Sequence, residues 1–363
     1  MSESITTVSK KPSHRHEEMS HVIVRFAGDS GDGIQLTGNQ FTNESALAGN
    51  DLATLPNFPA EIRAPAGTLA GVSGFQIHFG SQEIYTPGDT PDVLVALNPA
   101  ALKQNLRELR PGGILLLNED AFTEKNLKQV GYSSNPLDDA ELRDKYRVYV
   151  VPISKLTKDA LADTGLSSRE IERCKNYFVL GLMLWMFNRP TDSTLSWINE
   201  KFAKKPELID ANTKALKAGM TYAEATEVFE VNYVLKPAKL APGKYRNITG
   251  TTAMAYGFVA AAQKSETPLF WGAYPITPAS ELLHELSRHK RFGITTFQAE
   301  DEIAAICSAI GASYAGALGI TCSSGPGISL KIEAMALAVI AELPLVVVNV
   351  QRGGPSTGLP TKT

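Results

Sequence analysis

Short apolar runs alternate with amphipathic stretches along most of the first half of the chain. Strands are predicted at Val22–Phe26, Phe75–Phe79, Val93–Leu97, Ile114–Leu117 and Val148–Val151. Helical spacing is found at Ile34–Ala48, Pro99–Leu109 and Ser168–Phe187, and more weakly at Thr194–Phe202, Pro206–Ala218 and Tyr222–Val228. Strands that are separated by helices predict a largely parallel α/β sheet.

The same alternation returns in the last third of the chain. Strands are predicted at Leu269–Trp271, Ile294–Phe297, Gly319–Thr321 and Leu345–Val350. Helices are predicted at Gly250–Ala262, Glu281–Leu286, Asp301–Tyr314 and Gly327–Ile340. The last strand is apolar at nearly every position, which suits a parallel strand buried on both faces. We therefore expect a second parallel α/β domain.

The periodicity fails between the two halves, where Val231–Tyr245 is rich in lysine and proline. We predict a disordered tail over residues 1–20, a first domain over 21–228, a linker over 229–247 and a second domain over 248–363. A four-stranded parallel sheet is small, and the sequence stops within a polar loop. We therefore expect the natural protein to continue beyond Thr363.

Composition narrows the functional classes. With 43% apolar and 20% charged residues the chain is typical of a soluble globular enzyme, and its net charge of −3 argues against nucleic-acid or anionic-membrane binding. There is no signal-peptide pattern, and the longest apolar run, Tyr177–Phe187, is too short to span a bilayer, so we expect a cytoplasmic protein. Its three separated cysteines are too few for an iron–sulfur cluster, and no metal site is predicted in this chain.

A glycine loop, Gly28-Asp29-Ser30-Gly31-Asp32-Gly33, follows the first predicted strand and opens the first helix. Such a loop lets backbone N–H groups approach a phosphate, although it matches neither the dinucleotide fingerprint nor the P-loop. Asp29 and Asp32 would repel a phosphate unless they point away or hold a cation, and a tight turn without a ligand is the alternative. Arg63 is either a solvated charge or, if it lies near this loop, a bidentate phosphate ligand.

Four predicted strand ends carry polar residues in the second domain. They are the stiff Tyr274-Pro275-Ile276-Thr277-Pro278 stretch, Glu300, the Ser323-Ser324 loop and Arg352. Because parallel strands end at one edge of a sheet, these residues should converge where α/β sheets bind ligands. Each has a simpler explanation, such as a rigid turn, a helix-dipole carboxylate or a structural ion pair. Glu300, if held in a dry cleft, would have a raised pKa and could share a proton with a heterocyclic nitrogen.

Together these motifs resemble the α subunit of 2-oxoacid:ferredoxin oxidoreductases in which a γ domain is fused ahead of the α domain. The motifs that carry the resemblance are the glycine loop, the YPITP stretch, Gln298-Ala299-Glu300-Asp301-Glu302, Ser323–Gly327 and Arg352–Gly358. The resemblance implies a Rossmann-like γ domain followed by a thiamine-diphosphate pyrimidine-binding domain. It implies oxidative decarboxylation of a 2-oxoacid, formation of an acyl-CoA and electron transfer to ferredoxin. A β subunit would supply Mg²⁺, the diphosphate site and a [4Fe-4S] cluster in an αβ pair that forms an (αβ)2 assembly.

Residue roles follow from the resemblance. Glu300 would be catalytic, through a hydrogen bond to the pyrimidine N1′ nitrogen. The thiamine side would also be formed by Tyr274, Pro275, Ile276, Ser323 and Ser324. The 2-oxoacid would be held by Thr277, Arg352, Ser356, Thr357 and Thr361. Coenzyme A would be held by Gly28, Ser30, Gly31, Gly33, Arg63 and Thr68.

The preferred substrate is 2-oxoglutarate, and pyruvate or a branched-chain 2-oxoacid remains open. Two other classes also remain: a non-catalytic subunit that binds acyl-CoA or organises a complex, and a non-oxidative thiamine-dependent lyase. A scaffold has no need of Thr277, Glu300 and Arg352 together, and a lyase has no evident use for the glycine-loop domain. Residues 1–363 are not expected to be catalytic without the partner.

Overall fold

The computed structural model describes residues 15–59, 64–226, 229 and 231–351. It divides into two compact units, Met1–Gly243 and Lys244–Thr363, and the division falls within the predicted linker. Five predicted site residues lie outside the described residues, namely Arg63, Arg352, Ser356, Thr357 and Thr361. The α/β fold class is confirmed, since both units are built on sheets made mainly of parallel strands.

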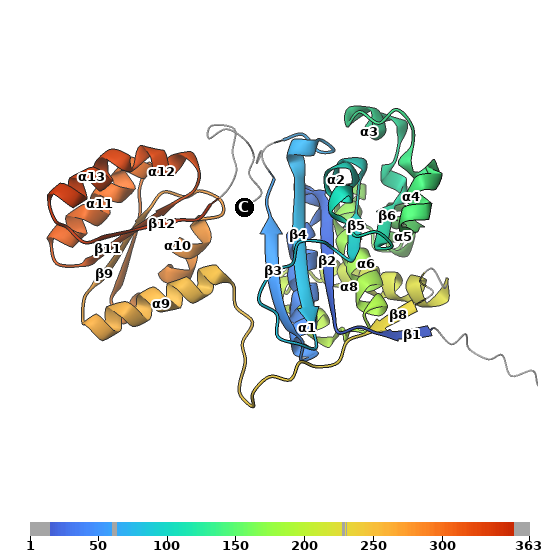
Figure 1. Ribbon diagram of the computed structural model, residues 1–363, viewed down its shortest axis with the longest axis horizontal. Coiled ribbons are helices and arrows are strands. Elements are labelled where there is room, and N and C mark those ends of the chain that lie inside the picture. The colour runs from blue at the N-terminus through green and yellow to red at the C-terminus, as the bar shows by residue number, and fades with distance from the viewer. Residues whose placement is uncertain (1–14, 60–63, 227–228, 230, 352–363) are drawn as a thin grey trace, which may run out of the picture. The chain divides into compact units, whose positions relative to one another are not determined.

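The first unit contains a six-stranded sheet of order β3-β4-β2-β5-β6-β7 (Figure 1). Its strands are β2 (His21–Asp29), β3 (Asp51–Asn57), β4 (Val72–Gly80), β5 (Val93–Ala96), β6 (Ile114–Asn118) and β7 (Arg147–Val151). β2, β5, β6 and β7 are parallel, whereas β4 runs antiparallel to both β2 and β3. The sequence analysis missed β3 because its apolar positions do not alternate and it contains Pro56, which an edge strand tolerates.

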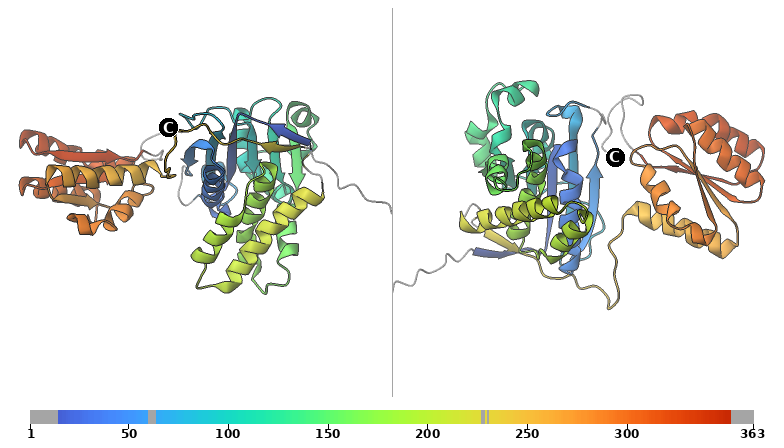
Figure 2. Two further views of the ribbon diagram at one scale, coloured as in Figure 1. Left: turned by 90° about the horizontal axis from the view of Figure 1, so that it is seen from below. Right: turned by 180° about the vertical axis from the view of Figure 1, so that it is seen from behind.

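Helices cover both faces of this sheet (Figures 1 and 2). One face carries α1 (Ile34–Leu47), α5 (Ile153–Ala160), α6 (Ser168–Met186), α7 (Asp192–Lys201) and α8 (Pro206–Ala225). The other carries α2 (Pro99–Asn105), α3 (Glu124–Gln129) and α4 (Ala140–Lys145). Each face encloses its own apolar core, so the sheet's central strands are buried on both sides. Short 3-10 turns lie at Ser30–Asp32, Leu69–Gly71, Leu106–Glu108, Glu119–Ala121, Pro136–Asp138 and, in the second unit, Lys290–Phe292.

The pair α6 and α8 packs with its backbones in close contact. Two weaker helices, Pro206–Ala218 and Tyr222–Val228, were predicted where the structure has the single helix α8. Gly219 lies between the two predicted ranges. A Cβ at Gly219 would lie 2.1 Å from the carbonyl oxygen of Phe178, and a Cβ at Gly181 would lie 2.1 Å from that of Leu216. These glycines therefore allow close helix approach, and Gly219 does not end the helix.

Two segments predicted to lack regular structure form a small parallel sheet. β1 (Arg15–Glu18) pairs with β8 (Val231–Val234), from Arg15 opposite Val231 to Glu18 opposite Val234. The expected disordered tail over residues 1–20 is therefore wrong for its last part, and the first residues of the predicted linker belong to the first unit. Isolated four-residue segments carry no alternation long enough to predict a strand, and long-range pairing creates this one.

The second unit contains a four-stranded parallel sheet of order β10-β9-β11-β12. Its strands are β9 (Leu269–Ala273), β10 (Ile294–Gln298), β11 (Leu318–Ser323) and β12 (Leu345–Asn349). One face carries α9 (Gly250–Ser265) and α10 (Ser280–Ser287), and the other carries α11 (Glu302–Tyr314), α12 (Pro326–Leu330) and α13 (Ile332–Ile340) (Figure 1). The helix predicted over Gly327–Ile340 is divided at Lys331 into α12 and α13. Within the described part of the chain, no helix is both long and apolar enough to cross a membrane.

Candidate functional site

A cavity of about 390 Å³ opens in the first unit at the carboxyl ends of its parallel strands. The helix that follows β2 and the helix that follows β5 cover opposite faces of the sheet, so their strand ends leave a crevice of the kind in which α/β folds bind ligands. The lining residues include Asp29, Asp32, Gly67, Asn98, Asn118, Asp120, Asn126, Ser154, Glu172 and Lys175.

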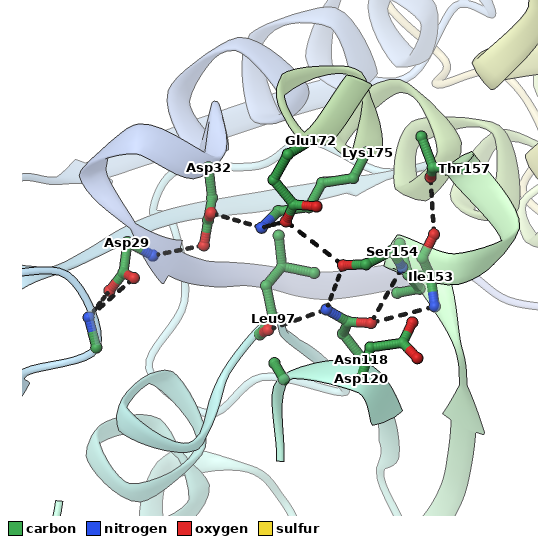
Figure 3. Close-up of polar contacts among 12 residues, drawn as sticks. Asp29, Asp32, Leu97, Asn118, Asp120, Ile153, Ser154, Thr157, Glu172 and Lys175 are labelled. Carbon is green, nitrogen blue, oxygen red and sulfur yellow. Dashed lines mark hydrogen bonds and ion pairs between the residues drawn. The ribbon is translucent and has the colours of Figure 1, made fainter. Parts of the chain in front are cut away.

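Lys175 is the only cation among the described residues that line this cavity. Its Nζ lies 2.9 Å from Oδ1 of Asp32 and 2.6 Å from Oε1 of Glu172 (Figure 3). Burial disfavours the charged ammonium, but the two carboxylates outweigh that effect and raise the pKa of Lys175. With Asp29 and Asp120 also in the lining, four carboxyl groups face one ammonium, so the cavity is acidic.

The two acids of the glycine loop are held by protein groups. Both carboxylate oxygens of Asp29 accept the N–H of Gly67, at 3.0 and 2.9 Å, and Oδ2 of Asp32 accepts the N–H of Asp29 at 2.8 Å (Figure 3). Burial raises the pKa of Asp29, although the Gly67 N–H partly offsets it. Asp29 therefore joins the glycine loop to the Ala66-Gly67 turn, and Asp32 holds the cation Lys175.

The glycines of this loop are required mainly by the turn itself. Gly33 has φ +71°, and a Cβ there would lie 2.4 Å from Nδ2 of Asn176. A Cβ at Gly28 would lie 2.8 Å from Oδ2 of Asp32, whereas Gly31 has open space around it. Close internal packing, rather than approach to a ligand, therefore explains Gly28 and Gly33 in this structure.

Asn118 completes the polar lining from the end of β6. Its Oδ1 accepts the N–H of Ile153 at 3.1 Å, and its Nδ2 donates to the carbonyl oxygen of Leu97 at 3.4 Å and to Oγ of Ser154 at 3.3 Å (Figure 3). The Ser154 hydroxyl in turn donates to Glu172 at 3.4 Å. The network thus links β5, β6, the start of α5 and α6 around the cavity.

The described residues among those predicted to hold coenzyme A lie next to this cavity. Gly28, Ser30, Gly31, Gly33 and Thr68 are not among its lining residues, but their neighbours Asp29, Asp32 and Gly67 are. The Thr68 hydroxyl donates to the carbonyl oxygen of Pro65 at 2.7 Å and so closes its own turn. The sequence analysis missed Asn98, Asn118 and Ser154, each of which lies at or just after the carboxyl end of a strand. That position was used as a signal only in the second domain.

The second unit brings its predicted strand-end residues to one edge. All four strands are parallel, so Tyr274–Pro278, Glu300 and Ser323-Ser324 follow the carboxyl ends of β9, β10 and β11. The helices after β9 and β11 cover opposite faces, which places a crevice between these two central strands. The peptide bond between Thr277 and Pro278 is cis, and the Thr277 side chain is exposed.

Glu300 is exposed directly after β10, whose end is tied to β9 by the bond from Ala299 N–H to the carbonyl oxygen of Ala273 at 2.9 Å. The dry cleft expected for Glu300 is therefore not supplied by the described residues. Asp301 caps α11, because its Oδ1 accepts the N–H of Ala304 at 2.7 Å. Of the three acids in this segment, Glu300 is the one left facing outward without a capping role.

Ser323 and Ser324 lie at the other side of the crevice and are fully buried. Their hydroxyl oxygens have no hydrogen-bond partner among the residues that the structure describes. Native buried hydroxyls are nearly always bonded, so unpartnered ones at a sheet edge suit a ligand or a further protein surface. A Cβ at Gly327 would lie 2.0 Å from Oγ of Ser323 and 2.8 Å from Oε1 of Glu302, so the serine loop packs against the start of α11.

Comparisons with known proteins match both units. The family model described as pyruvate ferredoxin/flavodoxin oxidoreductase matches residues 23–222, and that described as pyruvate flavodoxin/ferredoxin oxidoreductase, thiamine diP-bdg, matches residues 261–363. The chain belongs to the pyruvate:ferredoxin/flavodoxin oxidoreductase family. The resemblance stated from the sequence is thereby confirmed.

Individual relatives within this family are similar over three quarters or more of this chain. The 2-oxoglutarate oxidoreductase subunit KorA of Mycobacterium tuberculosis is 58% identical over 96% of this chain and 53% of its own length. The 2-oxoacid:ferredoxin oxidoreductase 2, subunit alpha, of Aeropyrum pernix is 30% identical over 75% of this chain and 47% of its own length. A solved structure of 2-oxoglutarate:ferredoxin oxidoreductase from Magnetococcus marinus, with 2-oxoglutarate, coenzyme A and succinyl-CoA bound, has a TM-score of 0.68 at 32% identity, covering 95% of this chain and 54% of that one. The chain thus spans about half the length of the relatives it matches.

Proposed function

We propose that this chain provides the γ-like and pyrimidine-binding portions of a 2-oxoglutarate:ferredoxin oxidoreductase. The reaction would convert 2-oxoglutarate and coenzyme A to succinyl-CoA and CO2 with reduction of ferredoxin, or run in reverse. The observation that carries the proposal is the convergence of the YPITP stretch, Glu300 and the buried serines at one sheet edge. That edge lies within the match to the thiamine-diphosphate-binding family model. The named relatives from M. tuberculosis and M. marinus support 2-oxoglutarate as the substrate.

The described residues fit one half of a thiamine diphosphate site. The unpartnered Ser323 and Ser324 hydroxyls and the exposed Glu300 carboxylate offer polar contacts to a heterocycle. In the described part of the chain, no three His, Cys, Asp or Glu side chains are grouped to hold a metal ion. A Mg²⁺–diphosphate group would therefore be held by another polypeptide. We infer that this is a β subunit that also carries a [4Fe-4S] cluster, passes electrons to ferredoxin and forms an (αβ)2 assembly with this chain.

In this proposal, each residue of the second unit has a separate task. Bound thiamine diphosphate would supply a nucleophilic carbon and an electron sink for decarboxylation of the 2-oxoacid. Glu300 would share its proton with the pyrimidine N1′ nitrogen once a partner covers its exposed carboxylate. Thr277 would bind the substrate's 2-oxo acid group, and Arg352 would pair with its carboxylate. Ser356, Thr357 and Thr361 would shape the pocket beyond them.

Coenzyme A is assigned to the first unit. The acidic cavity disfavours the phosphate groups of this substrate and suits its uncharged, amide-rich arm, whose N–H groups can donate to Asp29, Asp120 or Asn118. Arg63, close in sequence to the Ala66-Gly67 turn, would bind phosphate outside the cavity. In this proposal the glycine loop positions Asp29 and Asp32 and does not itself bind the diphosphate of coenzyme A.

The test is redox-dye reduction by the natural full-length chain co-purified with its partner. Thiamine diphosphate, Mg²⁺ and coenzyme A would be supplied, and 2-oxoglutarate, pyruvate and a branched-chain 2-oxoacid compared. Coenzyme-A-dependent reduction with 2-oxoglutarate is expected. Reduction with another of these acids instead would correct the substrate, and no reduction with any 2-oxoacid would favour the scaffold or the lyase.

A matched pair of variants tests the catalytic assignment. Glu300→Gln should abolish turnover while the cofactor still binds, because the amide cannot share a proton with the pyrimidine. Asp301→Asn removes the adjacent carboxylate but preserves the helix cap, since asparagine caps as well as aspartate, so turnover should persist. Equal turnover of Glu300→Gln and the unaltered enzyme would remove Glu300 from the mechanism.

A further inference from the structure

Lys331 is a fully buried cation beneath the strand-end loops of the second unit. It separates α12 from α13, and its exposed fraction is 0%. Its Nζ donates to the carbonyl oxygen of Glu302 at 2.8 Å and to Oγ1 of Thr321 at 3.1 Å. Neither the motif analysis nor the proposed chemistry uses this residue.

Its surroundings show that the charge is costly. Burial lowers the pKa of Lys331, and the nearby Cys322 sulfur and the carboxylates of Glu302 and Asp301, which favour the charged form, do not offset it. Burying a charge that has no ion-pair partner is costly, so fold stability alone gives no reason for a lysine here.

The two hydrogen bonds of Lys331 connect the two loops assigned to the thiamine side. Glu302 lies two residues after Glu300, and its carbonyl oxygen belongs to the first turn of α11. Thr321 lies in β11, two residues before the buried Ser323. One ammonium group therefore ties the segment that follows β10 to the end of β11, across the crevice at the sheet edge. The close approach of Gly327 to Ser323 and Glu302 leaves little room for these loops to move independently.

We propose that Lys331 is a positioning residue that fixes the Glu300 loop against the Ser323-Ser324 loop. We assign it no contact with the substrate or the cofactor, since its ammonium is engaged by the carbonyl oxygen of Glu302 and the hydroxyl of Thr321. It acts by setting where the Glu300 carboxylate stands relative to the serine hydroxyls. This inference rests on the proposed role of Glu300 in a thiamine-dependent reaction.

The test compares Lys331→Met with Thr321→Val in the natural full-length enzyme with its partner subunit. Lys331→Met removes both hydrogen bonds and the charge at similar length, whereas Thr321→Val removes one acceptor and leaves the bond to Glu302. Lys331→Met should lower kcat by about 100-fold, the typical loss for a reacting group displaced by about 1 Å, while KM for the 2-oxoacid changes by less than about threefold. Hydrogen–deuterium exchange of the α11 amides, which reports on the second unit alone, should be unchanged or slower. Thr321→Val should retain most of the turnover.

A second readout separates positioning from a general structural role. Deuterium exchange at the C2 proton of bound thiamine diphosphate, followed by NMR, reports on Glu300 before any substrate binds. Lys331→Met should slow this exchange about as much as kcat, with cofactor affinity preserved. Turnover and C2-proton exchange like those of the unaltered enzyme would overturn the inference, and so would loss of turnover together with reduced protection of the α11 amides or lost cofactor binding. If the unaltered holoenzyme shows no 2-oxoacid-dependent reduction, the proposed function fails instead, whatever Lys331→Met does.

Discussion

Replacing Lys175 by methionine tests whether the network around the first-unit cavity is held by its single cation. The side chains of Lys175 and Asp32 are only 11% and 13% exposed, so Asp32 would be left as a nearly buried, unpaired carboxylate. Breaking a buried pair in this way costs about 3–5 kcal/mol. Glu172 is 52% exposed and can be rehydrated, so its lost contact adds little. Because water can enter from the cavity and hydrate Asp32, the cost should lie at the lower end of this range. We therefore expect Lys175→Met to destabilise the first unit by about 3 kcal/mol.

The assay is hydrogen–deuterium exchange of the α6 amides, because one melting temperature for a chain of two units would mix their transitions. A loss of about 3 kcal/mol should reduce protection of the slowest α6 amides by roughly a hundredfold. Lys214→Met is the matched control: Lys214 also bridges two carboxylates, Asp163 and Asp210, but those are 71% and 55% exposed. Its cost should be much smaller than that of Lys175→Met, because water screens these exposed pairs. Adding Asp32→Asn to Lys175→Met should restore most of the protection, because the unpaired charge is removed. Equal effects of Lys175→Met and Lys214→Met would refute the reasoning.

Further predictions concern pH, packing and thiol reactivity. The folded-state pKa of Lys175 is raised above 10.5, so its contribution to stability should be complete below pH 10.5 and should disappear only above that folded pKa. Measuring stability against pH for the native chain and for Lys175→Met in parallel would show this. Gly219→Ala should destabilise the protein by about 1–3 kcal/mol or more, because the added Cβ would meet a backbone oxygen. Gly257→Ala in α9 should be neutral or stabilising, because no atom lies within 4 Å of the added Cβ. Denaturant unfolding measures both effects, and equal effects would contradict the close packing of α6 and α8. Under native conditions iodoacetamide should modify the exposed Cys307 far faster than the buried Cys174 and Cys322. Burial raises the thiol pKa of Cys174 to about 11 and that of Cys322 to about 12, so neither forms the reactive thiolate readily. Uniform labelling of the three cysteines in mass spectrometry would contradict this.

The sequence alone determined the elements whose periodicity is local. Buried parallel strands are continuous apolar runs, so β5, β6 and β12 were located to within one or two residues, and α6 was found from its helical spacing. The placement of Tyr274–Pro278, Glu300 and Ser323 at one edge of the second sheet was also predictable, because the strand order does not matter when every strand is parallel. All carboxyl ends then share one edge, and the residues that follow them must converge there.

Only the tertiary structure decided the features that depend on contacts distant in sequence. β1, β3 and β8 form because partner strands complete their hydrogen bonds, which no local pattern records. The first-unit cavity depends on Asn118, Ser154 and Lys175, which come from different elements and show no common spacing. The charge of Asp32 looked unfavourable for a ligand loop because its partner lies 143 positions away in the chain, the difference between 175 and 32. Lys331 lies within the helix predicted over Gly327–Ile340, and only the packing of α11 and β11 around it shows that its ammonium is buried between the start of α11 and β11.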